Sequence, residues 1–94
     1  MGRNRWGVYL LRCADGTFYC GVTNDVENRI GRHNAGRGAR YTRGRRPVKL
    51  VAWSGLVFSQ GNALRAELQV KRCERSRKLQ RLRALAKKPL TGKP

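Results

Sequence analysis

Two short runs of aromatic and β-branched residues lie near the start of the chain, and they constrain its fold more than any other feature. The runs are residues 6–13 and 18–22, and Asp15-Gly16 lies between them. Asp-Gly is typical of tight hairpin turns, and the residue types on either side favour strands. The sequence therefore predicts that the domain opens with a β-hairpin.

The length of the hairpin loop decides whether Tyr9 and Tyr19 can face the same site. Side chains alternate between the two faces of a strand, so a two-residue loop of Asp15-Gly16 would place the tyrosines on opposite faces. A loop with an odd number of residues, such as 15–17, would place both on one face. A shared site therefore requires the odd loop.

Helix signals follow the hairpin. Asn24, with Glu27 three residues later, is typical of a capping box and predicts a helix that begins there and ends near His33. Residues 36–47 then combine three glycines, five arginines and a proline. We expect an exposed cationic loop there, because glycine and proline interrupt regular structure.

The second half of the chain supplies one strand and two helices. Residues 48–58 favour a strand that would break at Ser54-Gly55. Ser59 can cap a helix to about residue 73, and Ser76 can begin another with leucines on one face. Residues 87–94 are typical of a flexible basic tail. At 94 residues, the chain 1–94 fits a single domain.

Charge limits the partners of this domain. The sequence has 22 Lys and Arg against 5 Asp and Glu, a formal net charge of +17. Nucleic acid is the commonest partner of so basic a domain, because neutralising phosphates releases counterions. No run approaches the ~18 apolar residues of a membrane span, and no signal peptide is recognisable. We expect a cytoplasmic protein that binds no membrane.

The first predicted helix carries polar residues on its apolar stripe. Val26, Arg29, Ile30 and His33 are spaced i, i+3, i+4 and i+7, so they share one face. A guanidinium and the imidazole therefore stand among apolar side chains. Purely structural roles fit this spacing as well as functional ones do, with Arg29 at the edge of the core and His33 hydrogen-bonded at the helix end.

Glu67 stands in the apolar arc of the following helix, between Ala63 and Leu64 on one side and Val70 on the other. A buried carboxylate needs a cation or a metal, and Arg29 could supply a structural ion pair. The other four acidic residues have local roles in a turn, a first helical turn or a helix junction. Two-metal nucleases gather several carboxylates, so a single metal at Glu67 is the more economical interpretation.

Five elements in this order resemble the GIY-YIG nuclease family. Gly7-Val8-Tyr9 resembles its first tripeptide, and Tyr19-Cys20-Gly21 resembles its second. Arg29 and His33 match the family's arginine and a histidine four residues later, and Glu67 falls at its metal-binding glutamate. Five elements in the right order and spacing are a strong signal.

The resemblance implies an α/β (α+β) fold, with a small three-stranded antiparallel sheet flanked by helices and a core of about residues 6–86. Gly7 and Gly21 would be structural residues of the two motifs. The implied activity is a metal-dependent endonuclease in a process such as DNA repair, acting on DNA more than RNA and directed by structure or backbone rather than base sequence. One departure is Val22, where many members carry a lysine.

The resemblance also implies a division of roles. Glu67 would hold Mg²⁺ or Mn²⁺, and Arg29 would stabilise charge on the reacting phosphate. Tyr9 or Tyr19 would orient or deprotonate the attacking water, with His33 assisting. We expect the surrounding cations to lower the tyrosine pKa.

The cationic loop is expected to hold the nucleic-acid backbone, with steep salt dependence and little sequence preference. Its candidate residues are Arg37, Arg40, Tyr41, Arg43, Arg45 and Arg46. Tyr41 could stack on a base. We expect a monomer or a weak homodimer.

Two other classes of function compete with the nuclease. A non-catalytic module that binds DNA or RNA and retains the fold explains the charge equally well. Binding alone, however, gives no reason to place Glu67 beside a phosphate. A basic module for protein or membrane-surface contact would leave the tyrosines and the glutamate unexplained.

Overall fold

The first strand of the predicted hairpin is the central strand of the sheet. The computed structural model describes residues 5–87, in which β1 (Arg5–Arg12) pairs antiparallel with β2 (Phe18–Thr23) and with β3 (Lys49–Trp53). The sheet order is β2-β1-β3. The short β4 (Phe58–Ser59) also pairs with β1, at its beginning. The predicted three-stranded antiparallel sheet is thus present, with one two-residue strand added.

The third strand breaks where the sequence predicted. β3 ends at Trp53, and Gly55 has a φ of +82°, which glycine adopts without the strain that a side chain would cause. The chain then returns to pair with β1 again as β4.

The hairpin loop has odd length. Arg12 pairs with Phe18, and the Cys13 amide donates to the Thr17 carbonyl at 2.8 Å, so residues 14–16 form the loop. The loop lies one residue earlier than 15–17, and its parity is the one that a shared site requires. In the resulting register Tyr9 is opposite Gly21 and Tyr19 is opposite Leu11, so both tyrosines lie on one face of the sheet.

Helix α1 (Val26–Asn34) begins one residue later than predicted. Its N-cap is Asp25, whose Oδ1 accepts from the Asn28 amide at 3.2 Å. Thr23 Oγ1 accepts from the Asp25 amide at 3.0 Å. This contact with the end of β2 fixes Asp25, rather than Asn24, at the start of the helix.

The cationic segment is more ordered than the sequence predicted. Residues 36–47 contain the short helix α2 (Arg40–Arg43), and Thr42 within it is fully buried. An entirely exposed loop was therefore the wrong prediction. The reason is a tertiary contact, because the Thr42 hydroxyl hydrogen-bonds to a side chain of α1.

The C-terminal helices agree closely with the sequence. Helix α3 (Gln60–Lys71) has the predicted cap, since Ser59 Oγ accepts from the Asn62 amide at 3.2 Å. Helix α4 (Arg75–Lys87) begins one residue before Ser76. The predicted basic tail, apart from Lys87, lies outside the described residues.

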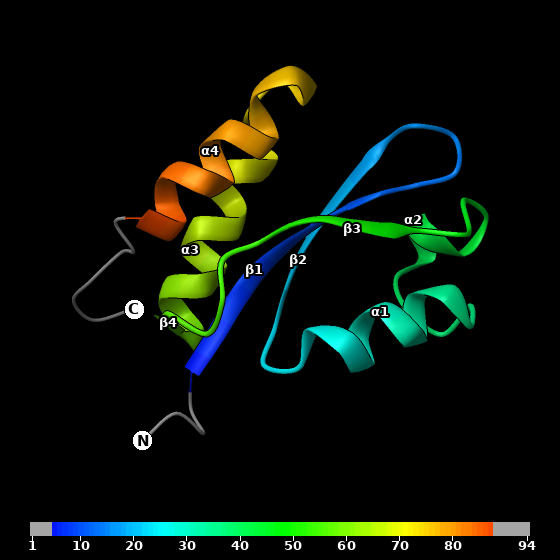
Figure 1. Cartoon of the computed structure of the whole chain (residues 1–94), viewed down its shortest axis with the longest axis horizontal. Coiled ribbons are helices and arrows are strands. Elements are labelled where there is room, and N and C mark those ends of the chain that lie inside the picture. Colours follow the sequence, from blue (N-terminus) through cyan, green and yellow to red (C-terminus); the bar gives the residue numbers. More distant parts are fainter. Residues whose placement is uncertain (1–4, 88–94) are drawn as a thin grey trace.

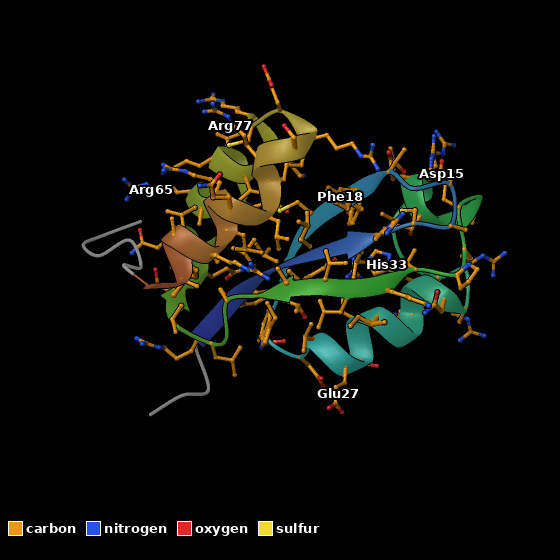
Figure 2. All side chains as sticks on the ribbon, turned by 45° about the horizontal axis from the view of Figure 1, so that its top comes forward. Asp15, Phe18, Glu27, His33, Arg65 and Arg77 are labelled. Atoms are coloured by element: carbon orange, nitrogen blue, oxygen red, sulfur yellow. The ribbon has the colours of Figure 1, made fainter. Side chains whose placement is uncertain are left out.

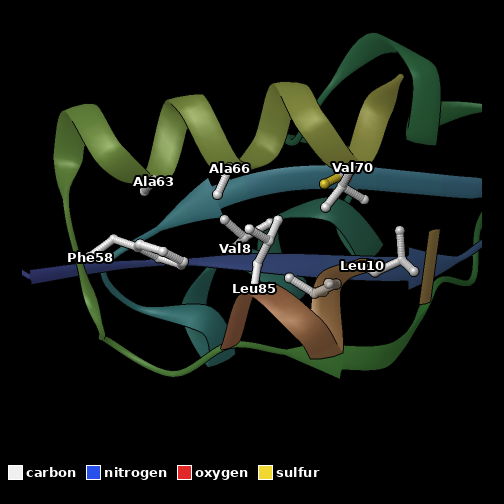
Figure 3. Close-up of a cluster of buried hydrophobic side chains, with 9 residues drawn as sticks. Val8, Leu10, Phe58, Ala63, Ala66, Val70 and Leu85 are labelled. Carbon is white, nitrogen blue, oxygen red and sulfur yellow. The ribbon is translucent and has the colours of Figure 1, made fainter. Parts of the chain in front are cut away.

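The sheet separates two layers (Figure 1). Helices α3 and α4 cover one face, where side chains of β1, β2 and both helices form the larger core (Figure 3). That core consists of Val8, Leu10, Cys20, Phe58, Ala63, Ala66, Val70, Leu82 and Leu85. On the other face, Val26 and Ile30 of α1 pack against a smaller cluster that contains Tyr9 and Leu11. The candidate site lies in this second layer.

None of the helices within residues 5–87 combines the length and the apolar character that crossing a membrane would need.

Candidate active site

Tyr9 is the centre of a buried polar group. Its side chain is 1 % exposed on the central strand β1. Its hydroxyl lies 2.9 Å from Nε2 of His33, and Arg29 Nε donates to the same oxygen at 3.4 Å. Arg29 and His33 reach it from α1, on the stripe that the helical spacing predicted. The structure therefore brings three of the five candidate catalytic residues into direct contact.

His33 connects Tyr9 to a residue that the sequence analysis missed. His33 is 0 % exposed, and its Nδ1 lies 2.7 Å from Thr42 Oγ1. Thr42 Oγ1 also donates to the Ala39 carbonyl at 3.0 Å. Because the single hydroxyl proton of Thr42 goes to Ala39, Oγ1 accepts from Nδ1–H in the tautomer of neutral His33 that is protonated there, and Nε2 is then free to accept from the Tyr9 hydroxyl. Nothing in the sequence near Thr42 distinguishes it from a loop threonine.

The protonation states of this group follow from its burial. Burial raises the pKa of Tyr9 to about 12, and the hydrogen bond from Arg29 only partly opposes this. Burial also lowers the pKa of His33, and the charge of Arg29 lowers it further. Both side chains are therefore neutral at pH 7. The prediction that surrounding cations lower the tyrosine pKa is wrong for Tyr9, because desolvation outweighs them.

Tyr19 joins the group through its ring. Its centroid lies 6.4 Å from that of Tyr9 and 5.3 Å from that of His33. Because the hairpin register puts both tyrosines on one face, the condition for a shared site is met. Tyr19 is half-buried, so it forms the outer wall of the group, whereas Tyr9 forms its buried floor.

Two glycines make room for this arrangement. Gly21 lies opposite Tyr9 in the sheet, and a Cβ at this position would collide with the Tyr9 hydroxyl. A Cβ at Gly38 would collide with Nδ1 of His33. In the first motif, a Cβ at Gly7 would collide with the Gly55 carbonyl and would lie 2.5 Å from the Trp53 ring. The structural role expected of Gly7 and Gly21 therefore has a steric cause.

Two of the candidate binding residues have other partners. Tyr41 stacks on Tyr19 with ring centroids 5.8 Å apart, and the Arg45 guanidinium lies 4.0 Å from the Tyr41 centroid. Arg45 Nε also forms an ion pair with Asp15 Oδ2 at 2.9 Å. Stacking of Tyr41 on a base, as the sequence suggested, would have to replace one of its two ring contacts.

The remaining loop arginines lie at the surface. Arg46 Nε donates to the Arg43 carbonyl at 2.8 Å, which ties this side chain to its own turn. Arg37, Arg40 and Arg43 are exposed. We call these three residues the cationic rim.

A cleft of about 280 Å³ lies beside the start of α1. Its lining residues are Trp6, Val22, Thr23, Asn24, Asp25, Asn28, Arg29 and Arg32. Arg29 thus belongs both to this cleft and to the buried group around Tyr9. Arg32, which the sequence analysis did not select, supplies a second cation to this cleft. Val22, which stands where many family members carry a lysine, lines the same cleft.

Glu67 is not part of the group around Tyr9. It lies on α3, its side chain is 18 % exposed, and Oε2 forms an ion pair with Lys71 Nζ at 3.6 Å. Burial in the core under α3 and α4 raises the pKa of Cys20, and the charge of Glu67 raises it further. The structural ion pair with Arg29, which the sequence offered as an alternative to a metal, is thus formed with Lys71 instead.

The apolar arc around Glu67 is only half buried. Ala63 and Val70 are 0 % exposed, whereas Leu64 and Leu68 are each 47 % exposed. Glu67 consequently lies at the border of the core, where water can reach it. The helical spacing alone did not show which side of the arc the sheet covers.

The carboxylate of Glu67 fits a particular kind of metal binding. Residues 5–87 contain no cluster of three or more His, Cys, Asp or Glu that could enclose an ion. Mg²⁺ commonly keeps several waters and binds through one or two carboxylates together with phosphate oxygens of a substrate. A water-accessible Glu67 fits this donor set.

The paired tyrosines on a hairpin, with an arginine and a histidine on the next helix, define a nuclease fold of the GIY-YIG class. The chain matches the GIY-YIG catalytic domain over residues 5–80, and it belongs to this family.

Similar proteins carry a common designation, UPF0213. The chain is 54 % identical over 74 residues to a UPF0213 protein of Nitratidesulfovibrio vulgaris, covering 79 % of this chain and 66 % of that protein, just under two thirds of its length. It is 46 % identical over 71 residues to one of Halobacterium salinarum, covering 76 % of this chain and 91 % of the relative. These names state no activity, metal or substrate.

Solved structures agree with the fold. The solution NMR structure of a UPF0213 protein from Bacillus halodurans has a TM-score of 0.50 at 44 % identity, covering 90 % of this chain and 88 % of the other. A second NMR structure, of a protein from E. faecalis, has a TM-score of 0.59 at 31 % identity and covers 98 % and 97 % of the two chains. The mixed α/β architecture with an antiparallel sheet is therefore shared by experimentally determined relatives.

Proposed function

We propose that this chain is a metal-dependent endonuclease that hydrolyses phosphodiester bonds, in DNA rather than RNA, and that it selects its substrate by backbone shape. The observation that carries the proposal is the buried contact of the Tyr9 hydroxyl with His33 and Arg29, beside a cleft that Arg29 also lines. Burying a hydroxyl, an imidazole and a guanidinium is costly unless they are paired. A core with no chemical role is more simply built from apolar side chains.

Arg29 would hold the scissile phosphate. Its guanidinium carries five N–H donors, and the Nε–H is directed to Tyr9. The other donors can bind a phosphate in the cleft, where Arg32 adds a second positive charge. Arg29 would therefore stabilise the additional negative charge of the transition state.

Tyr9 would act as a neutral relay. With a pKa of about 12, it holds its proton at pH 7, so it is not a preformed base. In the tautomer with the His33 proton on Nδ1, water transfers a proton to the Tyr9 oxygen as Tyr9 transfers its own to Nε2 of His33. The water oxygen bonds to phosphorus, the P–O3′ bond breaks, and the leaving oxygen takes a proton from solvent.

Glu67 is the residue that would hold the divalent ion. When bound, Mg²⁺ or Mn²⁺ supplies Lewis-acid stabilisation of charge on the phosphate oxygens. The ion pair between Glu67 and Lys71 is long, at 3.6 Å, and lies at a partly exposed position. It therefore presents only a small barrier to metal binding.

The first test is cleavage by the native chain and by Glu67→Ala. Single-stranded, duplex, flapped and branched DNA, together with RNA, would be incubated with Mg²⁺ or Mn²⁺. We expect Glu67→Ala to lose cleavage roughly 100-fold or more while it retains binding. Glu74→Ala is the matched control, because Glu74 is an exposed carboxylate at the junction of α3 and α4, and it should cut normally.

A nucleic-acid-binding module without turnover is the second candidate. The observation that favours it is the position of Glu67, which pairs with Lys71 and lies outside the group around Tyr9. If the native chain binds the panel of substrates and cuts none of them with either metal, this function replaces the nuclease. Glu67 would then be a structural carboxylate of α3.

A further inference from the structure

A second basic surface lies on the opposite side of the molecule from Tyr9. A cleft of about 570 Å³ lies along the groove between helices α3 and α4. The residues that line it are Gln69, Arg72, Cys73, Arg77, Gln80, Arg81 and Ala84. We call it the α3/α4 cleft. Three of its lining residues are arginines, and none is acidic.

Other cations of these helices serve the fold. Lys78 Nζ donates to the carbonyls of Val70 and Lys71 at 3.1 and 2.8 Å, which caps the end of α3. The Arg75 guanidinium donates to the Gly16 carbonyl and lies 5.3 Å from the Phe18 ring centroid. These contacts explain why a lysine and an arginine occupy these two positions.

The arginines of the α3/α4 cleft have no comparable structural reason. Arg77 and Arg81 are one turn apart on α4, and like charges at this spacing destabilise a helix. Arg81 donates to the Gln69 side chain, a neutral partner that leaves its charge uncompensated. Arg72 lines the same cleft, where its charge adds to theirs. A polyanion bound in the cleft would neutralise these charges and offset the repulsion among the arginines.

The two basic surfaces face in different directions. The sheet lies between them, with α1 and α2 on one face and α3 and α4 on the other. In Figure 2, Arg77 lies on the side of the molecule away from Glu27 of α1. A segment held at each surface would therefore lie on a different side of the sheet.

We infer that the α3/α4 cleft binds the phosphate backbone of a second nucleic-acid segment, so that one molecule bridges two segments. This inference rests on the nucleic-acid binding of the proposed function. Arginine donors would contact phosphates, and the amides of Gln69 and Gln80 can hydrogen-bond to phosphate or sugar oxygens. A bridging molecule would favour branched substrates, in which two segments meet.

The test is capture of one duplex by another. One duplex is fixed to beads, a second is labelled, and retention of the label by the full chain is measured. Arg77→Gln combined with Arg81→Gln should reduce retention roughly tenfold or more and leave the affinity for a single duplex within about twofold. Arg12→Gln combined with Lys49→Gln removes the same charge from exposed, paired ends of β1 and β3, and it should bridge normally.

The outcomes separate this inference from the proposed function. If the native chain binds no single duplex, nucleic-acid binding itself fails. If it binds a single duplex and the α3/α4 variant bridges as the native chain does, the inference is wrong and bridging comes from a dimer with two copies of one site. Light scattering of the native chain with and without DNA identifies that dimer, and thermal melting shows whether both variants are folded.

Discussion

At the scale of the residue, the properties of Tyr9 and His33 come from being buried together. Each is at most 1 % exposed, and they share a 2.9 Å contact. Desolvation disfavours the charged form of either side chain, so it raises the pKa of Tyr9 and lowers that of His33. The pair is therefore suited to passing a proton, because neither partner is ionised beforehand.

The depressed pKa of His33 predicts that stability falls in acid. Above the ordinary histidine pKa of 6.5 the folded and unfolded chains both hold neutral His33. As the pH falls below it, the unfolded chain takes up a proton that the folded chain resists, so unfolding is favoured. Between about pH 7 and pH 5, the melting temperature of the native chain should fall more than that of His33→Gln. Equal falls in the two proteins would mean that other groups cause the acid sensitivity.

At the scale of the element, α2 holds the site in place although it has only four residues. Its Thr42 is buried and fixes the ring of His33, and Tyr41 on the same short helix stacks on Tyr19. The cationic segment is therefore a wall of the site as well as the proposed binding surface. Among residues 5–87, every buried polar side-chain atom has a hydrogen-bond partner, which agrees with a site that is already assembled.

Replacing Thr42 by valine should destabilise the fold. The change keeps the shape and removes the hydroxyl, which leaves Nδ1 of the buried His33 without its 2.7 Å partner. We expect a loss of about 1–3 kcal/mol in the free energy of unfolding, measured with urea. Thr17→Val, which removes a more exposed hydrogen bond to Asp15, should cost less than about 1 kcal/mol. A Thr42 variant as stable as native would show that α2 does not support the site.

At the scale of the whole molecule, the sheet separates the larger apolar core from the polar group around Tyr9. One face carries the larger core under α3 and α4, and the other carries the polar group, the adjoining cleft and the cationic rim. The net charge is +17, and arginines line a cleft on each side of the sheet. Long-range attraction to a polyanion therefore acts on the whole surface, whereas the position of each cation determines which contacts persist in salt.

The salt dependence of duplex binding should show whether the cationic rim contacts phosphates. Removing one cation that neutralises a phosphate lowers the slope of log affinity against log salt by about 0.9 for a duplex. Replacing Arg37, Arg40 and Arg43 by glutamine should therefore reduce the slope by about three, measured by fluorescence anisotropy. The double variant Arg12→Gln and Lys49→Gln should have a slope close to native. An unchanged slope in the rim variant would mean that other residues bind the duplex.

Local signals in the sequence predicted much of the fold. The hairpin, the break at Ser54-Gly55, the Ser59 cap and the stripe of Arg29 and His33 each depend on residues within a few positions of one another. The start of α1 was missed by one residue, because Asp25 is held by a contact with Thr23 at the end of β2. The sequence showed only that a shared site requires a hairpin loop with an odd number of residues. The structure shows that the loop has an odd number.

The order of residues along the chain is enough to specify the family, the strongly basic charge and every element except α2 and the separate strand β4, because local spacing and composition carry them. Three other properties became visible only in the folded chain: Thr42 completes the group around His33, burial raises the Tyr9 pKa to about 12, and Glu67 pairs with Lys71 outside that group. Each of these depends on which surfaces the folded sheet and helices press together. Desolvation and long-range hydrogen bonds arise from that packing and have no signature in residue spacing.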